Sequence, residues 1–310
     1  MNLKKVIVVP KVSVFDYSKS QFKLTEEALF AKWRDEGMTE RDIENVMRAH
    51  ENNRKAVDTM KSIFGEDNII HRDSLNKDLV RESDLVISLG GDDHFQYVSH
   101  FVDSQLIMGV NSDPISSEGN MLYFHAGEVA GFIENLKSEH FRVEEWTRLE
   151  AQIISGKNTL NVVLASSQYA ILTEDPEEMV RYRLQLNGKS EIQRGSGLIV
   201  ATGVGSTGWY KGASKYAGRN CKFPKTERIA KLILREPFDK EDTSGITTYK
   251  MYNSTLLEGD ELTLTYLSHG LGRLSTDCQV KYDLIRGNQV KIRISPLNLR
   301  VIARQEEVAK

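Results

Sequence analysis

Leu85-Val86-Ile87-Ser88-Leu89-Gly90-Gly91-Asp92-Asp93-His94 is an apolar run that ends abruptly in two glycines and two carboxylates. Short apolar runs bounded by turn residues are typical of buried strands. Gly90 and Gly91 would let the backbone turn tightly and approach a ligand closely. Asp92 would then stand at the carboxyl end of the strand, where open α/β sheets bind ligands. An ordinary strand followed by a Gly-Asp turn explains this segment alone equally well.

The segments around this run alternate between strand and helix patterns. Residues 6–10, 68–70, 85–89 and 107–111 are strand candidates, and helical patterns cover 25–61, 75–83 and 95–101. Thr39 and Asp42 have the spacing of a capping box, which favours a helix start inside the longest helical pattern. The alternation predicts an α/β domain with a doubly wound, parallel sheet.

The pattern changes after about residue 140. Short β-prone runs follow, each bounded by turn residues, at 148–155, 159–165, 182–186, 198–201, 261–267 and 290–294. Asn187-Gly188 is a strong signal for a two-residue hairpin turn. A β-rich second domain is therefore expected after the α/β domain.

The composition excludes several classes of protein. The 310 residues carry a net charge of -3, so no overall positive field would recruit nucleic acid. Cys221 and Cys278 are the only cysteines, which excludes a disulfide scaffold and favours a cytoplasmic, reducing location. No apolar stretch approaches the length of a membrane span, and the first apolar run is too short for a signal peptide. We expect neither nucleic acid nor membrane as a partner.

A second glycine-rich stretch runs from Ile199 to Tyr210 and reads IVATGVGSTGWY. Backbone N–H groups in such a loop can point at phosphate or ribose oxygens, and its hydroxyl groups would add donors. Trp209 could stack on an aromatic ring of a ligand. A turn with an N-capping Ser206 or Thr207 and a core tryptophan is the simpler explanation of this loop alone.

Together the two loops resemble those of the ATP–NAD kinases, which carry Gly-Gly-Asp-Gly after a strand and a hydroxyl-rich glycine loop in a β-rich domain. The closest likeness is to the mitochondrial-type NAD kinases and their bacterial relatives. Ser196-Gly197-Leu198, Arg235-Glu236-Pro237 and the segment 109–119 also resemble that branch. No Gly-x-Gly-x-x-Gly follows the first strand, which argues against a dehydrogenase.

The resemblance implies a reaction and a role for the first loop. NAD kinases transfer the γ-phosphate of ATP, or of polyphosphate, to the adenosine-ribose 2′-hydroxyl of NAD. Asp92 would be the catalytic carboxylate that orients or deprotonates that hydroxyl. The phosphate of ATP would be bound by Gly90, Gly91, Asp93 and His94. Mg²⁺, or another divalent metal, would offset the phosphate charge, with Asp92 and Asp93 as its candidate ligands.

The resemblance also assigns NAD-binding residues and a domain plan. NAD would be contacted by Asn111, Asn161, Thr202, Gly205, Ser206, Thr207 and Trp209. Asp277, in a segment that resembles the family's Asp-Gly-Gln, would have a structural role. An α/β domain over 1–140, completed by 295–310, and a β-sandwich over 141–294 are expected. A homodimer or homotetramer is expected as well.

Two departures from the family pattern leave other functions open. Asp93 and His94 replace a glycine and a threonine, and Val162 replaces the glutamate of an Asn-Glu pair. A second carboxylate repels a triphosphate unless a metal or a protonated histidine screens it. His94 would either donate to a phosphate or cap the helix. The alternatives are a nucleotide-binding protein with lost or reduced catalysis, and a kinase acting on another nucleotide or on a lipid.

Overall fold

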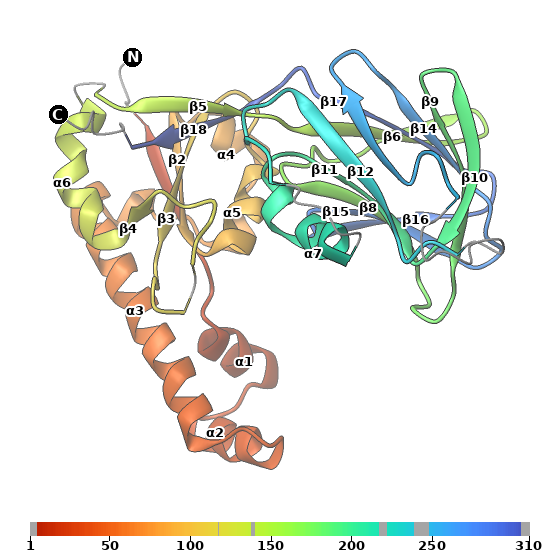
Figure 1. Cartoon of the computed structure of the whole chain (residues 1–310). Coiled ribbons are helices and arrows are strands. Elements are labelled where there is room, and N and C mark those ends of the chain that lie inside the picture. The colour runs from red at the N-terminus through yellow and green to blue at the C-terminus, as the bar shows by residue number, and fades with distance from the viewer. Residues whose placement is uncertain (1–4, 117, 138–139, 217–221, 239–247, 305–310) are drawn as a thin grey trace. The chain divides into compact units, whose positions relative to one another are not determined.

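The computed structural model describes residues 5–116, 118–137, 140–216, 222–238 and 248–304 (Figure 1). The chain divides into two compact units, of which unit 1 holds the residues up to Val143 together with the strand from Arg300, and unit 2 holds Glu144–Leu299. The predicted divisions after residues 140 and 294 differ from these by a few residues. Cys221 and residues 305–310 lie outside the described residues.

Unit 1 is built on one sheet whose order is β1-β2-β3-β18-β5, with β4 pairing beside β3. The strands are β1 (Val6–Pro10), β2 (Leu85–Gly90), β3 (Leu106–Asn111), β4 (Phe124–His125), β5 (Arg142–Trp146) and β18 (Leu299–Ala303). The pairs β1–β2, β2–β3, β3–β4 and β3–β18 are parallel. Every residue of β2 and β3 is buried, as expected for the centre of a parallel sheet.

Helices cover both faces of this sheet. The helices of unit 1 are α1 (Val14–Phe22), α2 (Glu26–Asp35), α3 (Glu40–Phe64), α4 (Lys77–Arg81), α5 (Asp92–Ser99) and α6 (Ala126–Lys137). Of these, α1 and α2 pack with the start of α3 in a separate cluster. Met60 of α3 packs in one core cluster with Val8 and Ile87. Phe95 of α5 contacts the other face, because a Cβ atom at Gly109 would lie 3.0 Å from its ring. Figure 1 shows α3 and α5 on opposite faces.

The single helix predicted over 25–61 is two helices. Gly37, with φ +92°, ends α2, because this left-handed conformation suits glycine. Thr39 then starts α3 with the predicted capping box: its side chain accepts from the Asp42 amide, and the Asp42 carboxylate accepts from the Thr39 amide. Helix α1 was not predicted; Ser13 caps it by accepting from the Asp16 amide.

Strand β1 is the first strand in the order of the unit 1 sheet, and one further residue pairs with its outer side. Ile69 forms a parallel bridge with Val8, and the amide of Ile70 donates to the Val8 carbonyl at 2.8 Å. The strand expected at 68–70 is therefore reduced to this bridge. Since β1 lies between Ile69 and β2, the chain first goes to one side of β1 and then returns to the other.

Unit 2 consists of two six-stranded sheets with antiparallel pairing. The first has the order β10-β9-β14-β17-β6-β7, and the second β13-β12-β11-β8-β15-β16. Their strands are β6 (Leu149–Ser155), β7 (Asn158–Asn161), β8 (Gln168–Thr173), β9 (Val180–Leu186), β10 (Lys189–Gly195), β11 (Gly197–Ala201), β12 (Ile229–Arg235), β13 (Asn253–Leu257), β14 (Leu262–Tyr266), β15 (Gly272–Thr276), β16 (Val280–Leu284) and β17 (Gln289–Ile294). Helix α7 (Trp209–Tyr216) follows β11.

The core of unit 2 lies between its two sheets. One buried cluster holds Leu184 and Val290 from the first sheet together with Leu198 and Leu274 from the second. This arrangement is a β-sandwich, so the prediction of an α/β unit with a β-rich unit is confirmed. Among the described residues no helix is both long and apolar enough to span a membrane.

The predicted hairpin turn is present, whereas one predicted strand is shorter than expected. Asn187 and Gly188 have φ values of +49° and +74°, as a type I′ turn requires, and they join β9 to β10. The strand expected over 159–165 stops at Asn161. Val162 enters the core there, at 7% exposure, and the chain leaves the ladder of β6 and β7.

Candidate functional site

The glycine turn closes the carboxyl end of β2. Gly90 pairs with Asn111 at the end of β3, so these two strand ends lie side by side. A Cβ atom at Gly90 would lie 3.0 Å from the His94 side chain, which leaves no comfortable room for a larger residue. Gly91 is extended and precedes helix α5, which begins at Asp92. The turn therefore points the first backbone N–H groups of α5 out of the sheet edge.

Asp92 is a half-buried carboxylate whose two oxygens are both held by backbone amides. Its Oδ2 accepts from the amide of Asn120 at 3.0 Å, and its Oδ1 accepts from the amide of Met121 at 2.9 Å. These bonds tie the first turn of α5 to the segment that follows β3. Each oxygen keeps a second lone pair, so the carboxylate can still accept from a hydroxyl group. Its position is fixed before any ligand arrives.

Asp93 differs from Asp92 in its surroundings. Its side chain is exposed in the first turn of α5, and the described residues offer it no hydrogen-bond or ion-pair partner. A negative charge there interacts favourably with the positive end of the helix dipole. Asp93 is thus an exposed carboxylate at the carboxyl edge of the sheet.

His94 lies inside unit 1, which corrects the expectation that it donates to a phosphate or caps a helix. The side chain is 4% exposed, and Nε2 donates to the Val9 carbonyl at 2.8 Å. Burial lowers the pKa of His94 to about 4, because the hydrogen bond to Val9 only partly opposes it and the charges of Arg72 and Lys11 disfavour a second cation. The imidazole is therefore neutral at pH 7 and serves to pack α5 against β1.

The neutral state of His94 predicts a pH dependence of stability. Its pKa of about 4 lies below the ordinary value of 6.5, so the unfolded chain binds the extra proton first as pH falls. Stability should be complete above pH 6.5 and decrease toward pH 4, by on the order of 2 kcal/mol at pH 5. Urea unfolding of wild type and His94→Gln at pH 5 and 7 would measure this, since the variant should lose that part of the pH dependence. An equal pH dependence in both proteins would contradict the assignment.

Asn111 shapes the turn after β3. It is 2% exposed, and its Oδ1 accepts from the amide of Asp113 at 3.0 Å. A Cβ atom at Gly119, which has φ +65°, would lie 2.9 Å from Asn111 Nδ2, so the segment that carries Asn120 is pressed against this amide. Asn111 and Asp92 thus position the same segment.

Asp113 is a buried carboxylate at this edge. Its Oδ1 accepts from Asn52 Nδ2 of α3 at 2.9 Å. The pKa of Asp113 is lowered: burial opposes ionisation, but hydrogen bonds from Ser116 and Asn52, with the charge of Lys11, outweigh it. This ionised, anchored side chain fixes the loop after β3 to α3.

The second glycine loop, in unit 2, is closed on itself. Thr202 and Ser206 are 0% and 1% exposed, and their hydroxyls donate to the carbonyls of Ser166 and Gly203, both at 2.6 Å. Thr207 donates to the Val204 carbonyl at 3.2 Å. The buried hydroxyls of Thr202 and Ser206 therefore use their protons inside the unit, whereas Thr207 is partly exposed.

The glycines of this loop are needed for close packing. A Cβ atom at Gly203 would lie 2.0 Å from the Pro224 carbonyl oxygen, and one at Gly205 would lie 2.4 Å from the Ser167 oxygen. Trp209 is partly buried, with the Arg235 guanidinium 4.6 Å from the centre of its ring. Arg235 therefore occupies one face of the ring that was expected to stack on a ligand.

The side chain of Asn161 is exposed to solvent, whereas that of Val162 is buried in the core of unit 2. Asn161 is exposed at the end of β7, and its Oδ1 accepts from Gln152 Nε2 at 3.0 Å. Val162 belongs to the core of unit 2. A glutamate at position 162 would place a charge in that core, so the valine here is a packing residue.

Asp277 holds a turn of unit 2 with three charge-assisted hydrogen bonds. It is 1% exposed and accepts from the amides of Ser166, Ser167 and Gln168 at 2.9, 2.9 and 2.7 Å. Its φ of +48° is in the left-handed region, which aspartate tolerates better than most residues. Since Ser166 and Ser167 also accept from Thr202, Asp277 supports the glycine loop.

The described part of the chain contains no cluster of three or more His, Cys, Asp or Glu side chains placed to bind a metal ion. Cys278 is an exposed thiol next to Asp277.

The chain is similar in sequence to curated NAD kinases. No protein-family model matches the chain. Over 138 residues it is 30% identical to the NAD kinase of Chlorobium limicola, a match that covers 43% of this chain and 45% of that enzyme. A longer match with the NAD kinase of Natranaerobius thermophilus, at 21% identity, covers 71% of this chain and 72% of that enzyme. Over these stretches the chain is similar to the ATP–NAD kinases.

The stretch matched at about 30% identity spans less than half the length of those relatives. Two solved kinases share the fold. Yeast NADH kinase, solved with NADH, has a TM-score of 0.65 at 14% identity, covering 77% of this chain and 68% of that one. The NAD kinase of Archaeoglobus fulgidus, solved with ATP, has a TM-score of 0.61 at 19% identity, covering 82% and 89%.

Several residues that shape the candidate site could not be predicted from the sequence. Asn52 reaches Asp113 from a position 61 residues earlier, and Arg72 stacks on Tyr97 with its guanidinium 4.0 Å from the ring centre. No local sequence motif indicates either of these contacts. The single usable signal was Asn111-Ser112-Asp113-Pro114, which marks a polar loop after a strand.

Proposed function

We propose that this protein is an NAD kinase, which transfers the γ-phosphoryl group of ATP to the adenosine-ribose 2′-hydroxyl of NAD and yields NADP. In this reaction the hydroxyl oxygen bonds to the γ-phosphorus, the bond to the β-phosphate oxygen breaks, and ADP leaves. The related chains are named NAD kinases, and the two solved neighbours were bound to NADH and to ATP. Their activities support the same reaction here.

The observation that carries the proposal is the fixed carboxylate of Asp92 at the carboxyl end of β2. Phosphoryl transfer needs alignment and charge neutralisation more than a strong base. A carboxylate held by two backbone amides can accept the 2′-hydroxyl proton and align its oxygen for attack. The first amides of α5, next to Gly90 and Gly91, suit a phosphate oxygen.

The NAD-binding assignments rest on the resemblance, and the contacts support them unequally. Asn161 is exposed and can contact a ligand directly. Asn111, Thr202, Gly205 and Ser206 are buried and would act by shaping their loops. Thr207 and Trp209 are partly exposed. We therefore assign direct contact to Asn161, Thr207 and Trp209, and a positioning role to the others.

Mg²⁺ is the proposed metal, carried mainly by the triphosphate. Mg²⁺ is usually held by one or two carboxylates together with substrate phosphates and water. Asp93, exposed and without a partner among the described residues, fits that need, and Asp92 keeps one lone pair on each oxygen. The metal would neutralise phosphate charge during transfer. A cytoplasmic location and a homodimer or homotetramer complete the proposal and rest on composition and resemblance alone.

Asp93→Asn should raise the Mg²⁺ concentration needed for half-maximal NADP formation roughly tenfold, because one metal ligand is lost. Magnesium titrations at fixed ATP and NAD would measure this. Asp67→Asn, the same change at another exposed carboxylate, is the control and should leave the titration unchanged. An unchanged Mg²⁺ requirement with a lower KM for ATP would show instead that Asp93 repels the triphosphate.

A panel of acceptors tests the proposed reaction. The protein would be incubated with ATP labelled in the γ-phosphate, Mg²⁺ and, separately, NAD, NADH, AMP, diacylglycerol or sphingosine. We expect label in NAD or NADH at least 100-fold faster than in the others. Label transferred preferentially to AMP or a lipid would contradict the proposal. Binding of NAD without any transfer would favour a nucleotide-binding protein.

A further inference from the structure

Unit 2 contains a pocket of about 830 Å³ on the outer face of its first sheet. It is lined by β9 and β10 and by the loops that follow β14 and β16 (Figure 1). The residues of β9 alternate between buried and exposed, and Arg181 and Arg183 are among the exposed ones. These two side chains therefore lie on the face of the sheet that is turned away from the sandwich core.

Positive charge predominates in the described lining of this pocket. Four arginines and a histidine lie there with a single carboxylate, and these residues are Arg181, Arg183, Arg194, Arg286, His269 and Glu178. We call the four arginines the arginine cluster. The whole chain has a net charge of -3, so the cluster does not follow from a basic composition.

Two members of the arginine cluster face each other across the hairpin of β9 and β10. Arg181 is directly opposite Arg194 in the antiparallel register. Like charges at directly opposed positions destabilise a sheet. The guanidinium of Arg194 lies 5.0 Å from the centre of the Phe238 ring, which holds it over the hairpin. An anion bound between the two guanidinium groups would relieve their repulsion.

Two loops bring further positive charge to the same place. The Leu267 amide donates to the Arg181 carbonyl at 2.8 Å, and the Arg181 amide donates to Ser268 Oγ at 2.7 Å. These bonds tie the loop after β14 to β9. The guanidinium of Arg286 donates in turn to the ring of His269 in that loop. Arg286 is therefore anchored beside Arg181, although the two are far apart in the sequence.

The arginine cluster lacks the acidic partners that other cations on this face have. On β17, Lys291 pairs with Glu261 at 2.7 Å. Arg293 of the same strand pairs with Glu150 at 3.1 Å. The described residues place no carboxylate within ion-pair distance of any member of the cluster. Its charge is thus uncompensated within the described part of the chain.

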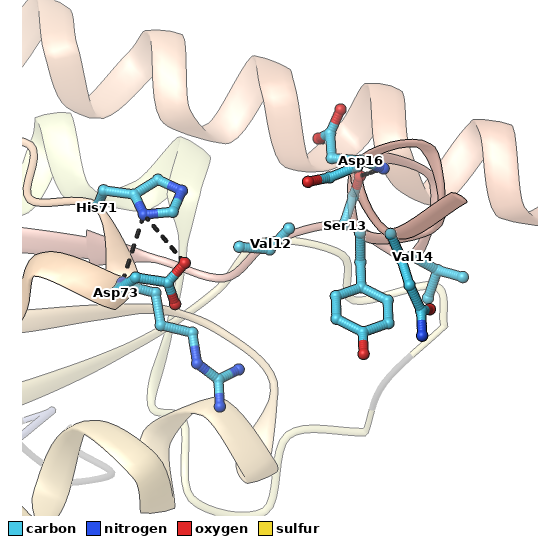
Figure 2. Close-up of a pocket in the computed structure, with 10 residues that line it drawn as sticks. Val12, Ser13, Val14, Asp16, His71 and Asp73 are labelled. Carbon is cyan, nitrogen blue, oxygen red and sulfur yellow. Dashed lines mark hydrogen bonds and ion pairs between the residues drawn. The ribbon is translucent and has the colours of Figure 1, made fainter. Parts of the chain in front are cut away.

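A pocket in unit 1 of similar volume, about 820 Å³, has the opposite charge balance (Figure 2). There Asp16 lies 3.3 Å from His50 Nδ1, and Asp73 lies 3.7 Å from His71 Nδ1. These two carboxylates outnumber the one arginine of that lining, Arg72. An excess of arginine is therefore a property of the unit 2 pocket and not of the cavities of this protein in general.

We propose that the arginine cluster binds a small molecule that carries two or more phosphate groups. Guanidinium groups bind phosphate oxygens through paired hydrogen bonds and stay charged at physiological pH. Four of them around one cavity exceed what a single phosphate can use, and the volume is typical of a small-molecule site. The lining shares no residue with either glycine loop, so the inference does not depend on the proposed kinase reaction.

A double variant, Arg181→Gln with Arg183→Gln, tests the site. Lys291→Gln with Arg293→Gln is the matched control, because it removes two cations from the same face of the same sheet. The probes are tripolyphosphate and orthophosphate, titrated by calorimetry without Mg²⁺ in about 0.15 M KCl, where purely long-range attraction is screened. Melting temperatures with and without tripolyphosphate, and the mass in solution by light scattering, would be measured for all three proteins.

We expect wild type to bind tripolyphosphate at least about tenfold more tightly than orthophosphate, and the test variant to lose at least about tenfold of that affinity. The control should stay within about twofold of wild type. Without any anion, the test variant should melt about 1–3 °C above wild type, because the opposed charges are removed. Tripolyphosphate should raise the melting temperature of wild type more than that of the test variant.

Four results would overturn the proposal. Wild type that does not bind tripolyphosphate, or that binds it no better than orthophosphate, has no such site. Equal affinity in wild type and the test variant would place the binding elsewhere. A test variant that melts below wild type without anion would show that the arginines serve the fold. A change of mass in the test variant would assign the arginine cluster to a contact between copies of the chain.

Discussion

Asp92→Asn is expected to lower the rate of NADP formation by about 10²–10⁴-fold. The amide side chain is uncharged, so it can neither take the 2′-hydroxyl proton nor hold that oxygen in line as an anionic acceptor does. One of its two terminal atoms is also a donor and would face the N–H of Asn120 or Met121. Initial rates with saturating ATP and NAD would measure the loss, and calorimetry should show NAD binding within about threefold of wild type.

Two further variants distinguish a catalytic role of the Asp92 carboxylate from a role in holding the loop. Asp93→Asn makes the same chemical change one residue later at an exposed position, and it should retain most of its activity at saturating Mg²⁺. Gly119→Ala disturbs the segment that Asp92 holds, because the new Cβ would meet Asn111, and it leaves the carboxylate intact. If Gly119→Ala loses as much activity as Asp92→Asn, then Asp92 acts by positioning that segment and the catalytic assignment is wrong.

Asp277→Ala should lower the free energy of unfolding of unit 2 by on the order of 3–5 kcal/mol. The substitution leaves three buried amides, of Ser166, Ser167 and Gln168, without their acceptor. It also places alanine at φ +48°, where a Cβ is strained. Urea unfolding followed by circular dichroism would measure the change.

Asp277→Asn should lose less stability than Asp277→Ala. Asparagine tolerates the left-handed backbone and keeps one carbonyl oxygen, so its loss should be about half that of alanine. Asp283→Ala, at an exposed position of β16, should change stability by no more than about 0.5 kcal/mol. A loss below about 1 kcal/mol in Asp277→Ala would show that water or another donor group replaces the carboxylate.

Features encoded within a few residues could be predicted from the sequence. The apolar run before Gly90 is a buried strand, the Thr39–Asp42 capping box starts a helix, and Asn187–Gly188 forms a hairpin turn. Each depends on local hydrogen bonds or on allowed φ values. The alternation of such elements was sufficient to predict the α/β unit and the β-rich unit.

Features that depend on distant partners could not be predicted. Asp92 bonds to amides 28 and 29 residues away, and Asp277 to amides about 110 residues away. His94 looked like a phosphate ligand because it follows Asp92 and Asp93, but one helical turn directs it toward Val9. The hydroxyls of Thr202 and Ser206 looked like ligand donors because a sequence does not show which carbonyls lie within reach.

The role of a glycine also depends on residues that are distant in the sequence. The backbone N–H groups of the second glycine loop were expected to face a ligand, whereas the structure gives Gly203 and Gly205 close contacts with Pro224 and Ser167. A glycine signals that a Cβ does not fit, but the neighbour that excludes it can be protein or ligand. Only the fold distinguishes the two cases.

In the proposed reaction Asp92 is the carboxylate that aligns the 2′-hydroxyl of NAD for phosphoryl transfer. The most direct measurement is NADP formation by the purified protein with NAD, ATP and Mg²⁺, read continuously through an NADP-specific dehydrogenase. We predict steady turnover by wild type and a loss of at least about 100-fold in Asp92→Asn. Failure of a wild-type protein that binds both nucleotides to form NADP would contradict the proposed reaction. Turnover at the wild-type rate in Asp92→Asn would contradict the role of Asp92.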